Sequence, residues 1–263
     1  MIALVVFDLD GTLVDSSRDL ASSTNAMLAD LGGTQLSEQV VASLVGEGAA
    51  VLVRRALERS GLAADTPGAL DRFLAHYDTR LLETTRPYSG MLETLTQLGE
   101  HHRLAVLTNK PSQPTARILE GLGMDGFFSD VIGGDSTFGR KPDPAGLVAL
   151  VDRAHTSPAK TLMIGDSPVD LATAERAGTR VCMARYGFGY RFDGHPFCGH
   201  EAFVDAASEI VEVVARMEGR VVLETMLDRF APGQVALADD YELSFVPMFL
   251  EYGPETLDVR ITS

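Results

Sequence analysis

Short apolar runs alternate with helical patterns along most of the chain, and this alternation constrains the fold more than any other feature. The runs at 2–7, 104–107, 161–164 and 180–184 are rich in aliphatic and β-branched residues and end at polar or Gly-containing turns. Such runs are typical of buried parallel strands. Helical spacing fills the intervals, for example at 90–101, 114–122 and 169–177. The pattern predicts an α/β fold, a doubly wound parallel sheet with helices on both faces.

The stretch from about residue 17 to residue 85 breaks this alternation. It shows no convincing strand, and its apolar residues recur at helical spacing: Leu20, Met27, Leu28, Leu31, Val51, Leu52, Leu57, Leu70, Phe73, Leu74, Tyr77 and Leu81. Gly32-Gly33 and Thr66-Pro67-Gly68 mark turns between the helices. We therefore expect an all-α helical cap at 17–85, inserted into an α/β catalytic core formed by residues 1–16 and 86–218.

The sequence changes character again from about Gly219. Short strands are expected at 235–237, 243–246 and 257–261, with turns at Pro232-Gly233 and Gly253-Pro254. No chemistry is recognisable in residues 219–263. We expect this C-terminal appendage to be a structural or oligomer-contacting element of a monomer or homodimer.

The formal net charge of -15 arises from 37 acidic and 22 basic side chains. Such a surface repels nucleic acid and anionic lipid, which argues against both as partners. A phosphorylated substrate would need a metal ion and one or two lysines to concentrate positive charge locally. The two cysteines, Cys182 and Cys198, are too few for a disulfide framework. No apolar run approaches the roughly 20 residues that span a bilayer, so a cytoplasmic protein is expected.

Polar side chains follow the predicted strands at their carboxyl ends, where open parallel sheets bind ligands. The residues at these positions are Asp8 and Asp10, Thr108 and Asn109, Asp166 and Asp170, and Gly187 to Gly189. Lys141 lies just beyond an apparent strand at 131–132 and joins the same edge. No structural need of a sheet explains so many charges there, and we expect them to form one site.

Phosphoryl transfer is the chemistry that such a cluster suits. Mg²⁺ prefers hard oxygen ligands, and Asp8 and Asp166 can supply two carboxylates. An aspartate can also attack phosphorus to give an aspartyl-phosphate. Asp10 would share a face with Asp8 in an extended strand, where it could protonate the leaving alkoxide and later deprotonate the attacking water. The remaining members of the edge would hold the non-bridging oxygens and balance their charge: Thr108, Asn109 and Lys141.

Four segments carry a resemblance to the haloacid dehalogenase superfamily. They are FDLDGTLVDS at 7–16, LTNKP at 107–111, GRKPDP at 139–144 and IGDSPVD at 164–170, in the order found in that family. The resemblance spans roughly residues 3 to 215. It implies a Rossmann-like core of the haloacid dehalogenase type, a helical cap, and a Mg²⁺-dependent phosphatase that acts on a small phosphorylated metabolite.

The resemblance also implies a role for each matching residue. Asp8 resembles the nucleophile and a metal ligand, and Asp10 resembles the acid/base, which also binds the metal through its backbone carbonyl. Thr108 matches the phosphate-binding hydroxyl, Lys141 the lysine that neutralises nucleophile and phosphate, and Asp166 a further metal ligand. Asp170 and Ser167 would support the metal shell. The other substrate- and phosphate-binding candidates are Gly11, Thr12, Asn109 and, in the cap, Arg54.

Within the superfamily the chain is most similar to the phosphoglycolate phosphatases. The segments that agree are 45–48, 52–57, 86–90, 133–135 and 186–190. This likeness implies 2-phosphoglycolate as the substrate. A carboxylate at position 10 suits a phosphatase or a mutase, because dehalogenase relatives lack one there.

Several alternatives remain open on the sequence. The enzyme could be a sugar-phosphate phosphatase, a phosphomutase or a pyrophosphatase on the same fold, or a non-catalytic regulatory protein. Asp170 also suits a helix N-terminus, since acids favour the dipole there, and Arg54 also suits a solvated helix surface. His195, Cys198 and His200 could ligate a transition metal, but no fourth ligand is evident.

Overall fold

A computed structural model describes residues 1–192, 201–227, 235–237 and 259–261 of this chain. Its main sheet has the strand order β5-β4-β1-β6-β7-β8, and each neighbouring pair is parallel. The strands are β1 (Leu4–Phe7), β4 (Arg103–Leu107), β5 (Asp130–Ile132), β6 (Thr161–Gly165), β7 (Arg180–Ala184) and β8 (Ala202–Val204). The chain runs outward from β1 to β5, returns to β6 and runs outward again. The carboxyl ends of β1 and β6 therefore flank the point where the winding reverses, the usual ligand site of such sheets.

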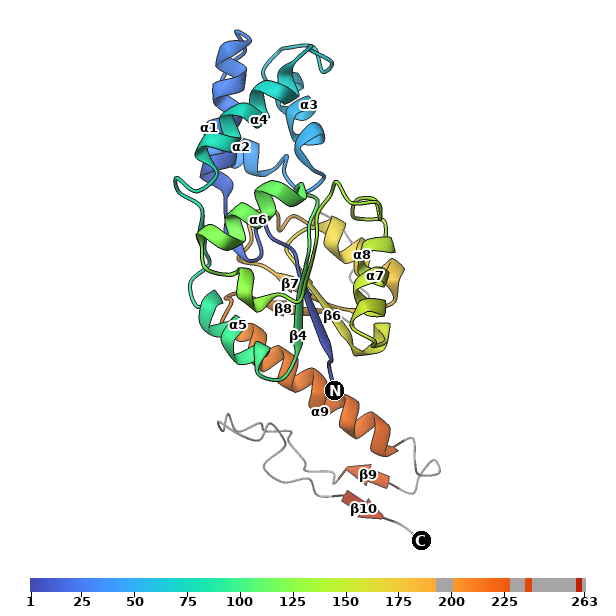
Figure 1. Ribbon diagram of the computed structural model, residues 1–263. Coiled ribbons are helices and arrows are strands. Elements are labelled where there is room, and N and C mark those ends of the chain that lie inside the picture. The colour runs from blue at the N-terminus through green and yellow to red at the C-terminus, as the bar shows by residue number, and fades with distance from the viewer. Residues whose placement is uncertain (193–200, 228–234, 238–258, 262–263) are drawn as a thin grey trace.

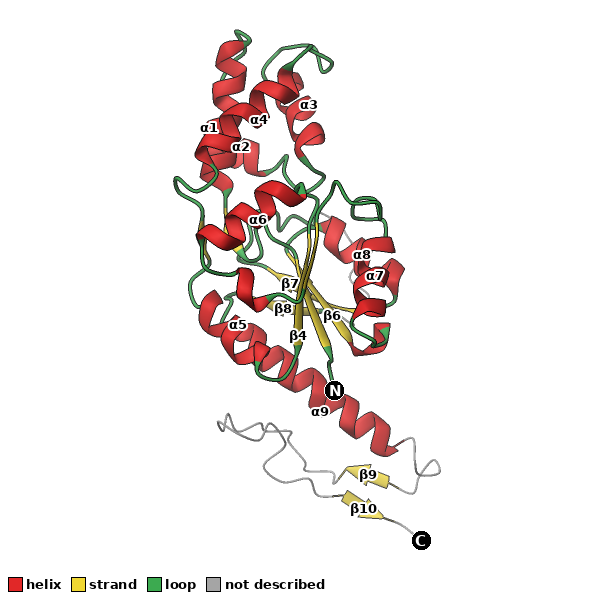
Figure 2. Cartoon of the chain, viewed as in Figure 1, coloured by secondary structure: helices red, strands yellow, loops and turns green. Residues whose placement is uncertain are grey.

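Helices cover both faces of this sheet (Figure 2). One face packs against α5 (Met91–Gly99), α6 (Ser112–Gly121) and α9 (Glu209–Leu227), and the other against α7 (Ala145–Arg153) and α8 (Pro168–Ala177). Two short 3-10 helices, η1 (Asp125–Phe127) and η2 (Pro158–Lys160), lie in the connections. The predicted doubly wound α/β fold is confirmed.

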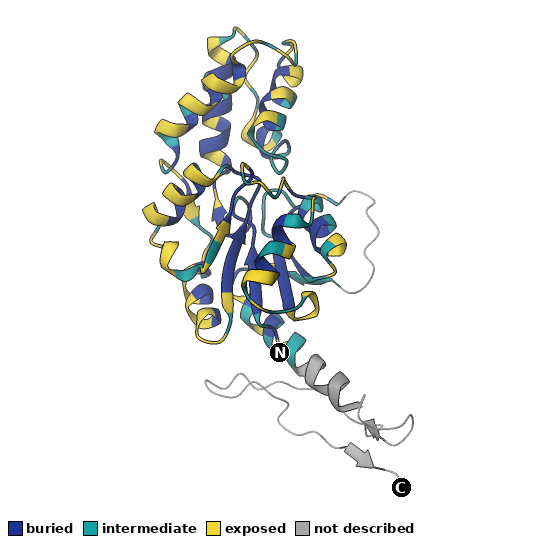
Figure 3. Ribbon diagram, turned by 45° about the vertical axis from the view of Figure 1, so that its right-hand side comes forward, coloured by how far each residue is buried: buried dark blue, intermediate teal, exposed yellow. Residues whose placement is uncertain are grey.

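Alternation along β1 explains why both faces are apolar. Val5 and Phe7 belong to the core cluster of one face, whereas Leu4 and Val6 belong to the cluster of the other. Successive side chains of a strand point to opposite faces, so a strand buried on both sides must be apolar throughout. Figure 3 shows the consequence: the central strands β1 and β6 are buried along their length, and exposed residues lie on the outer sides of the helices.

Four helices form the layer above the carboxyl edge of the sheet in Figure 1: α1 (Ser17–Asp30), α2 (Glu38–Ala42), α3 (Ala49–Arg59) and α4 (Ala69–Arg80). They enter and leave through β2 (Val14–Asp15) and β3 (Arg86–Pro87), which pair antiparallel. Most of their periodic apolar residues are buried as predicted, but Leu70 and Leu74 on α4 are 36% and 39% exposed.

A buried carboxylate joins the two connections between cap and core. Asp19, in the first turn of α1, accepts hydrogen bonds from the backbone N–H and the hydroxyl of both Thr84 and Thr85. These bonds tie the start of the cap to the segment that returns to the core.

The C-terminal region begins with a helix that crosses the expected boundary. Helix α9 continues through Gly219 to Leu227, so the change of sequence character after residue 218 does not coincide with the end of an element. Beyond it, β9 (Val235–Leu237) and β10 (Val259–Ile261) pair antiparallel, as expected for two of the three predicted strands. The predicted strand at 243–246 lies outside the described residues, and so does the segment with His195, Cys198 and His200. Among the described residues, no helix is long and apolar enough to cross a membrane.

Candidate active site

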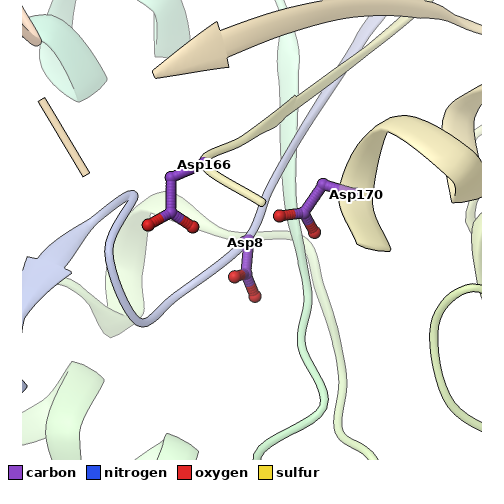
Figure 4. A group of neighbouring side chains, drawn as sticks. All are labelled: Asp8, Asp166 and Asp170. Atoms are coloured by element: carbon purple, nitrogen blue, oxygen red, sulfur yellow. The ribbon is translucent and has the colours of Figure 1, made fainter. Parts of the chain in front are cut away.

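Three aspartates from three different elements converge at the carboxyl edge of the sheet (Figure 4). Asp8 follows β1, Asp166 follows β6, and Asp170 lies in the first turn of α8. One carboxylate oxygen from each lies within 4.8 Å of the other two, and all three residues are buried. Asp8 and Asp166, which the sequence analysis assigned to one site, lie together here, with Asp170 as the third member. We call these three residues the aspartate cluster.

Lys141 is the cation of this cluster. Its Nζ lies 2.7 Å from Asp8 Oδ1 and donates a hydrogen bond of 2.6 Å to Asp170 Oδ1. The contact with Asp8 lacks the alignment of a hydrogen bond and is an ion pair. Burial alone would lower the pKa of Lys141, but Asp170 and Asp8 outweigh burial and raise that pKa above its ordinary value. The lysine therefore stays charged at physiological pH.

One lysine does not compensate three buried carboxylates. Burial raises the pKa of Asp8 to about 6, although Lys141 opposes the shift, and Asp170 and Asp10 add to it. Burial, Asp170 and Asp8 together raise the pKa of Asp166 well above its ordinary value. Crowded carboxylates resist ionisation because each charge repels the next. The cluster is thus short of positive charge.

Glycines make room for Asp166. A Cβ on Gly11 would lie 1.9 Å from Asp166 Oδ2, and one on Gly187 would lie 2.2 Å from Asp166 Cβ. Gly11 also has a φ of +89°, which other residues adopt only with strain. The N–H of Gly189 donates a hydrogen bond of 2.7 Å to Asp166 Oδ2 and helps to orient that carboxylate. These positions require glycine because the chain passes in direct contact with the carboxylate.

Asp170 and Ser167 form a capping box at the start of α8. Ser167 donates hydrogen bonds from its hydroxyl and its N–H to Asp170 Oδ2, at 2.6 and 3.1 Å. The other oxygen, Oδ1, accepts from Lys141. Asp170 therefore serves both interpretations left open by the sequence, because it caps the helix and also belongs to the cluster.

Asp10 faces a partner that the sequence analysis did not single out. Lys110 Nζ donates to both of its carboxylate oxygens, at 2.7 and 3.0 Å, and the Ser16 hydroxyl donates to Oδ1 at 2.6 Å. Asp10 is therefore paired with Lys110 and is not a member of the aspartate cluster. Burial alone would lower the pKa of Lys110, but Asp10 and Tyr77 raise it above its ordinary value.

A signal for Lys110 was present in the composition. Lysine occurs at only three positions in the chain, 110, 141 and 160, although lysine and arginine together number 22. Two of these three are nearly fully buried at the site, at 7% and 5% exposure. Buried lysines are rare unless paired, so a lysine next to Thr108-Asn109 was a candidate on this ground.

Asn109 forms hydrogen bonds with backbone groups of the core and the cap. Its Nδ2 donates to the carbonyls of Gly46 and Lys141, at 2.8 and 3.0 Å, and its Oδ1 accepts from the Lys141 N–H at 2.8 Å. The side-chain amide is therefore engaged with backbone groups, while Asn109 also lines the cavity described below. Asn109 holds Lys141 in place and connects it to the cap loop at Gly46.

Two hydroxyls lie at the same edge. Thr108 is buried, and its Oγ1 accepts a hydrogen bond of 3.2 Å from the Lys110 N–H. Thr12 is fully buried, and its Oγ1 has no hydrogen-bond partner among the described residues. An unpaired buried hydroxyl is costly unless a ligand satisfies it. Thr108 lines the cavity described below, as a phosphate contact requires, whereas Thr12 is not among the lining residues.

A cavity lies between the cap and this edge of the sheet. Its core side includes Asp8, Asp10, Thr108, Lys110 and Asp166. Its cap side is lined by uncharged residues, among them Val45, Leu52, Phe73, Leu74 and Tyr77.

Arg54, a candidate for substrate binding in the sequence analysis, lies outside the cavity lining. It is exposed on α3 and is not among the residues that line the cavity. Its neighbour Arg55 pairs with Glu47.

The donor set fits a hard divalent cation. Three carboxylates converge in a buried space with a single lysine, and burial together with the neighbouring carboxylates raises the pKa values of Asp8 and Asp166. Carboxylate oxygens are the ligands that Mg²⁺ prefers. Asp8, Asp166 and Asp170 are the side chains that would hold such an ion.

Comparison with known proteins identifies the family of this chain. Residues 5–184 match the family model of haloacid dehalogenase-like hydrolases. A phosphoglycolate phosphatase of Rhodospirillum rubrum is 45% identical over 192 residues, which is 70% of this chain and 80% of the relative. The enzyme of the same name from Mannheimia succiniciproducens is 38% identical over 213 residues, covering 77% and 95% of the two chains.

A solved structure has the same architecture. The crystal structure of a predicted phosphoglycolate phosphatase from Haemophilus somnus superimposes with a TM-score of 0.72 at 33% identity, covering 81% of this chain and 97% of that one. The family match covers more than half of the chain, and the relatives are 33% to 45% identical. The chain therefore belongs to the haloacid dehalogenase-like hydrolases and is a phosphatase similar to the phosphoglycolate phosphatases of that family.

Proposed function

We propose that this protein hydrolyses 2-phosphoglycolate with Mg²⁺ and forms an aspartyl-phosphate on Asp8. The observation that carries the proposal is the convergence of Asp8, Asp166 and Asp170 around one point, with Lys141 in contact with two of them. Four charged groups from distant parts of the sequence meet there without neutralising one another, which favours a site for a cation and a phosphate over a structural ion pair.

The first step forms a covalent intermediate. An oxygen of Asp8 attacks phosphorus, the bond between phosphorus and the ester oxygen breaks, and Asp10 donates its proton to the departing alkoxide. Lys141 neutralises charge on Asp8 and the phosphate. Thr108 offers its hydroxyl to the phosphate oxygens.

The second step restores the enzyme. Asp10, now ionised, takes a proton from a water that attacks phosphorus, and the bond between phosphorus and Asp8 breaks to release inorganic phosphate. A Mg²⁺ held by the aspartate cluster would neutralise phosphate charge and orient the phosphate toward Asp8. Residues 17–85 act as the cap domain that covers this site and excludes water.

The lining of the cavity supports a small acid over the other candidate substrates. A sugar phosphate would place several hydroxyls against Leu52, Phe73 and Leu74, where they would lose hydrogen bonds to water. Pyrophosphate would bring further negative charge to a cavity whose described lining offers Lys110 as its cation. The two-carbon acid of 2-phosphoglycolate avoids the first cost, and it brings a single carboxylate charge, which one lysine can balance.

A substrate panel tests the proposal. Wild-type protein with Mg²⁺ is expected to release phosphate fastest, by kcat/KM, from 2-phosphoglycolate among a set of sugar phosphates, pyrophosphate and hydroxy-acid phosphates. The Asp8→Asn variant is expected to lose activity by about 10³-fold or more, because an amide cannot act as the nucleophile.

Controls separate loss of chemistry from loss of folding. Mg²⁺ should raise the thermal midpoint of the wild type, since an ion bound only by the folded state at 100 times its Kd adds about 2.7 kcal/mol. The rise should be smaller in Asp8→Asn, whose circular dichroism should be unchanged. Near-normal turnover in Asp8→Asn, or a better substrate elsewhere in the panel, would contradict the mechanism or the substrate respectively.

A further inference from the structure

Lys110 lies between the carboxyl edge of the sheet and the cap. It follows β4, its side chain is only 6% exposed, and its Nζ lies 2.7 Å from Asp10 Oδ2. The same Nζ stands 4.7 Å from the centre of the Tyr77 ring on α4. Both residues line the cavity. Lys110 therefore contacts Asp10, the proposed acid, and Tyr77, which lines the cavity where the leaving group would lie.

Charge in the cavity is distributed unevenly. Of the described residues that line it, Asp8, Asp10 and Asp166 are acidic and Lys110 is the one cation. Lys141 lies behind the lining, between Asp8 and Asp170. Any negative charge on the alcohol half of a substrate must find its counter-charge at Lys110, because the cap side of the lining is uncharged.

Lys110 and Tyr77 have unused hydrogen-bonding capacity. An ammonium group has three N–H donors, and Asp10 takes two of those on Lys110, at 2.7 and 3.0 Å. Tyr77 is 95% buried, and its hydroxyl has no hydrogen-bond partner among the described residues. Burial raises the pKa of Tyr77 to about 12, with Lys110 opposing the shift, so the hydroxyl stays a donor at neutral pH. Tyr77 lines the cavity, and a polar group of a ligand can satisfy an unpaired buried hydroxyl of such a residue.

We propose that Lys110 and the hydroxyl of Tyr77 bind a carboxylate on the leaving half of the substrate and so select phosphate esters of 2-hydroxy acids. This inference rests on the proposed function and adds the side chains that recognise the acid. In such an ester one carbon separates the ester oxygen from the carboxyl carbon. Because Lys110 is in hydrogen-bond contact with Asp10, that spacing lets the oxygen face Asp10 while the carboxylate reaches Lys110.

The test compares two esters that differ at a single group. 2-Phosphoglycolate carries the carboxylate, and 2-hydroxyethyl phosphate carries an uncharged CH₂OH in its place. Wild-type protein is expected to prefer 2-phosphoglycolate by about 10- to 100-fold in kcat/KM, the range of a charge-assisted hydrogen bond. In Lys110→Met both esters should lose rate because Asp10 loses its partner, but the preference should fall to within about threefold. Tyr77→Phe, which keeps the ring, should lower the preference about three- to tenfold.

Further variants make the result decisive. Lys160→Met alters the exposed lysine on η2 and should leave the preference at its wild-type value. Equal losses on both esters in Lys110→Met would overturn the inference, because Lys110 would then act only on Asp10. If that variant does not fold, an unchanged preference in Tyr77→Phe or a wild type without preference overturns it equally. A wild type that hydrolyses both esters without preference refutes the carboxylate site alone, whereas hydrolysis of neither ester refutes the proposed substrate as well.

Discussion

Two buried aspartate sites lie on either side of the cap–core junction, and they differ in how their charge is satisfied. Asp19 is 1% exposed and accepts hydrogen bonds from Thr84 and Thr85. Burial raises its pKa, but the hydrogen bonds from the two threonines outweigh burial, and the net shift is downward. In the aspartate cluster the pKa values of Asp8 and Asp166 are instead raised.

The contrast shows that burial by itself does not identify a functional carboxylate. Neutral donors that point at one carboxylate stabilise its ionised form and make it a structural anchor. Carboxylates that face one another with too few hydrogen-bond donors are costly to ionise. A bound cation or substrate can compensate their negative charge, which is typical of functional sites. By this criterion Asp19 anchors the cap to the core, and the aspartate cluster is the site that we propose for substrate and metal.

The largest effect is expected from removing the cation of the cluster. Lys141→Ala should lower kcat by at least about 10²- to 10³-fold, because negative charge on the phosphate would develop without compensation. Steady-state phosphate release with saturating Mg²⁺ measures this. Lys160→Ala is the matched control, since Lys160 is exposed and precedes β6, whose opposite end carries Asp166. A Lys141→Ala enzyme of near-normal rate would remove this lysine from the chemistry.

Substitution of Asp19 should lower stability and not turnover. Asp19→Ala leaves the buried donors of Thr84 and Thr85 without their acceptor and should lower the free energy of unfolding by about 3 kcal/mol. Urea denaturation followed by circular dichroism measures the change. Asp65→Ala, at an exposed position of the same cap, should cost less than about 0.5 kcal/mol. Equal effects of the two substitutions would contradict the anchoring role of Asp19.

The smallest effect is the pH dependence that Asp19 gives to the free energy of unfolding. Its pKa is lower in the folded than in the unfolded state, so its ionised form contributes stability above the unfolded value of about 3.9. That contribution is lost as the pH falls through the folded pKa. The difference in unfolding free energy between wild type and Asp19→Asn should therefore be full at pH 7 and shrink below about pH 4. A difference that grows toward low pH would show that the sign is wrong.

Some site residues could be read from the sequence because strand ends determine their place. Asp8 and Asp166 follow apolar runs that become adjacent parallel strands, and the carboxyl ends of such strands share one edge. The cap was equally accessible, since helical spacing persists from Leu20 to Leu81. Arg54 illustrates the limit. Helical periodicity places it on α3, but the orientation of that helix over the sheet leaves it exposed and outside the cavity lining.

The sequence by itself determined the parallel sheet, the inserted helices and the strand-end carboxylates, because hydrophobic periodicity and turn residues act locally along the chain. Only the tertiary structure decided which charges meet. In the folded protein Lys110 pairs with Asp10, and Lys141 pairs with Asp8 and Asp170. The side-chain amide of Asn109 forms hydrogen bonds with backbone groups. Electrostatic and hydrogen-bond partners depend on distances of a few ångströms between segments that are up to 162 residues apart in sequence, from Asp8 to Asp170, and no local pattern encodes those distances.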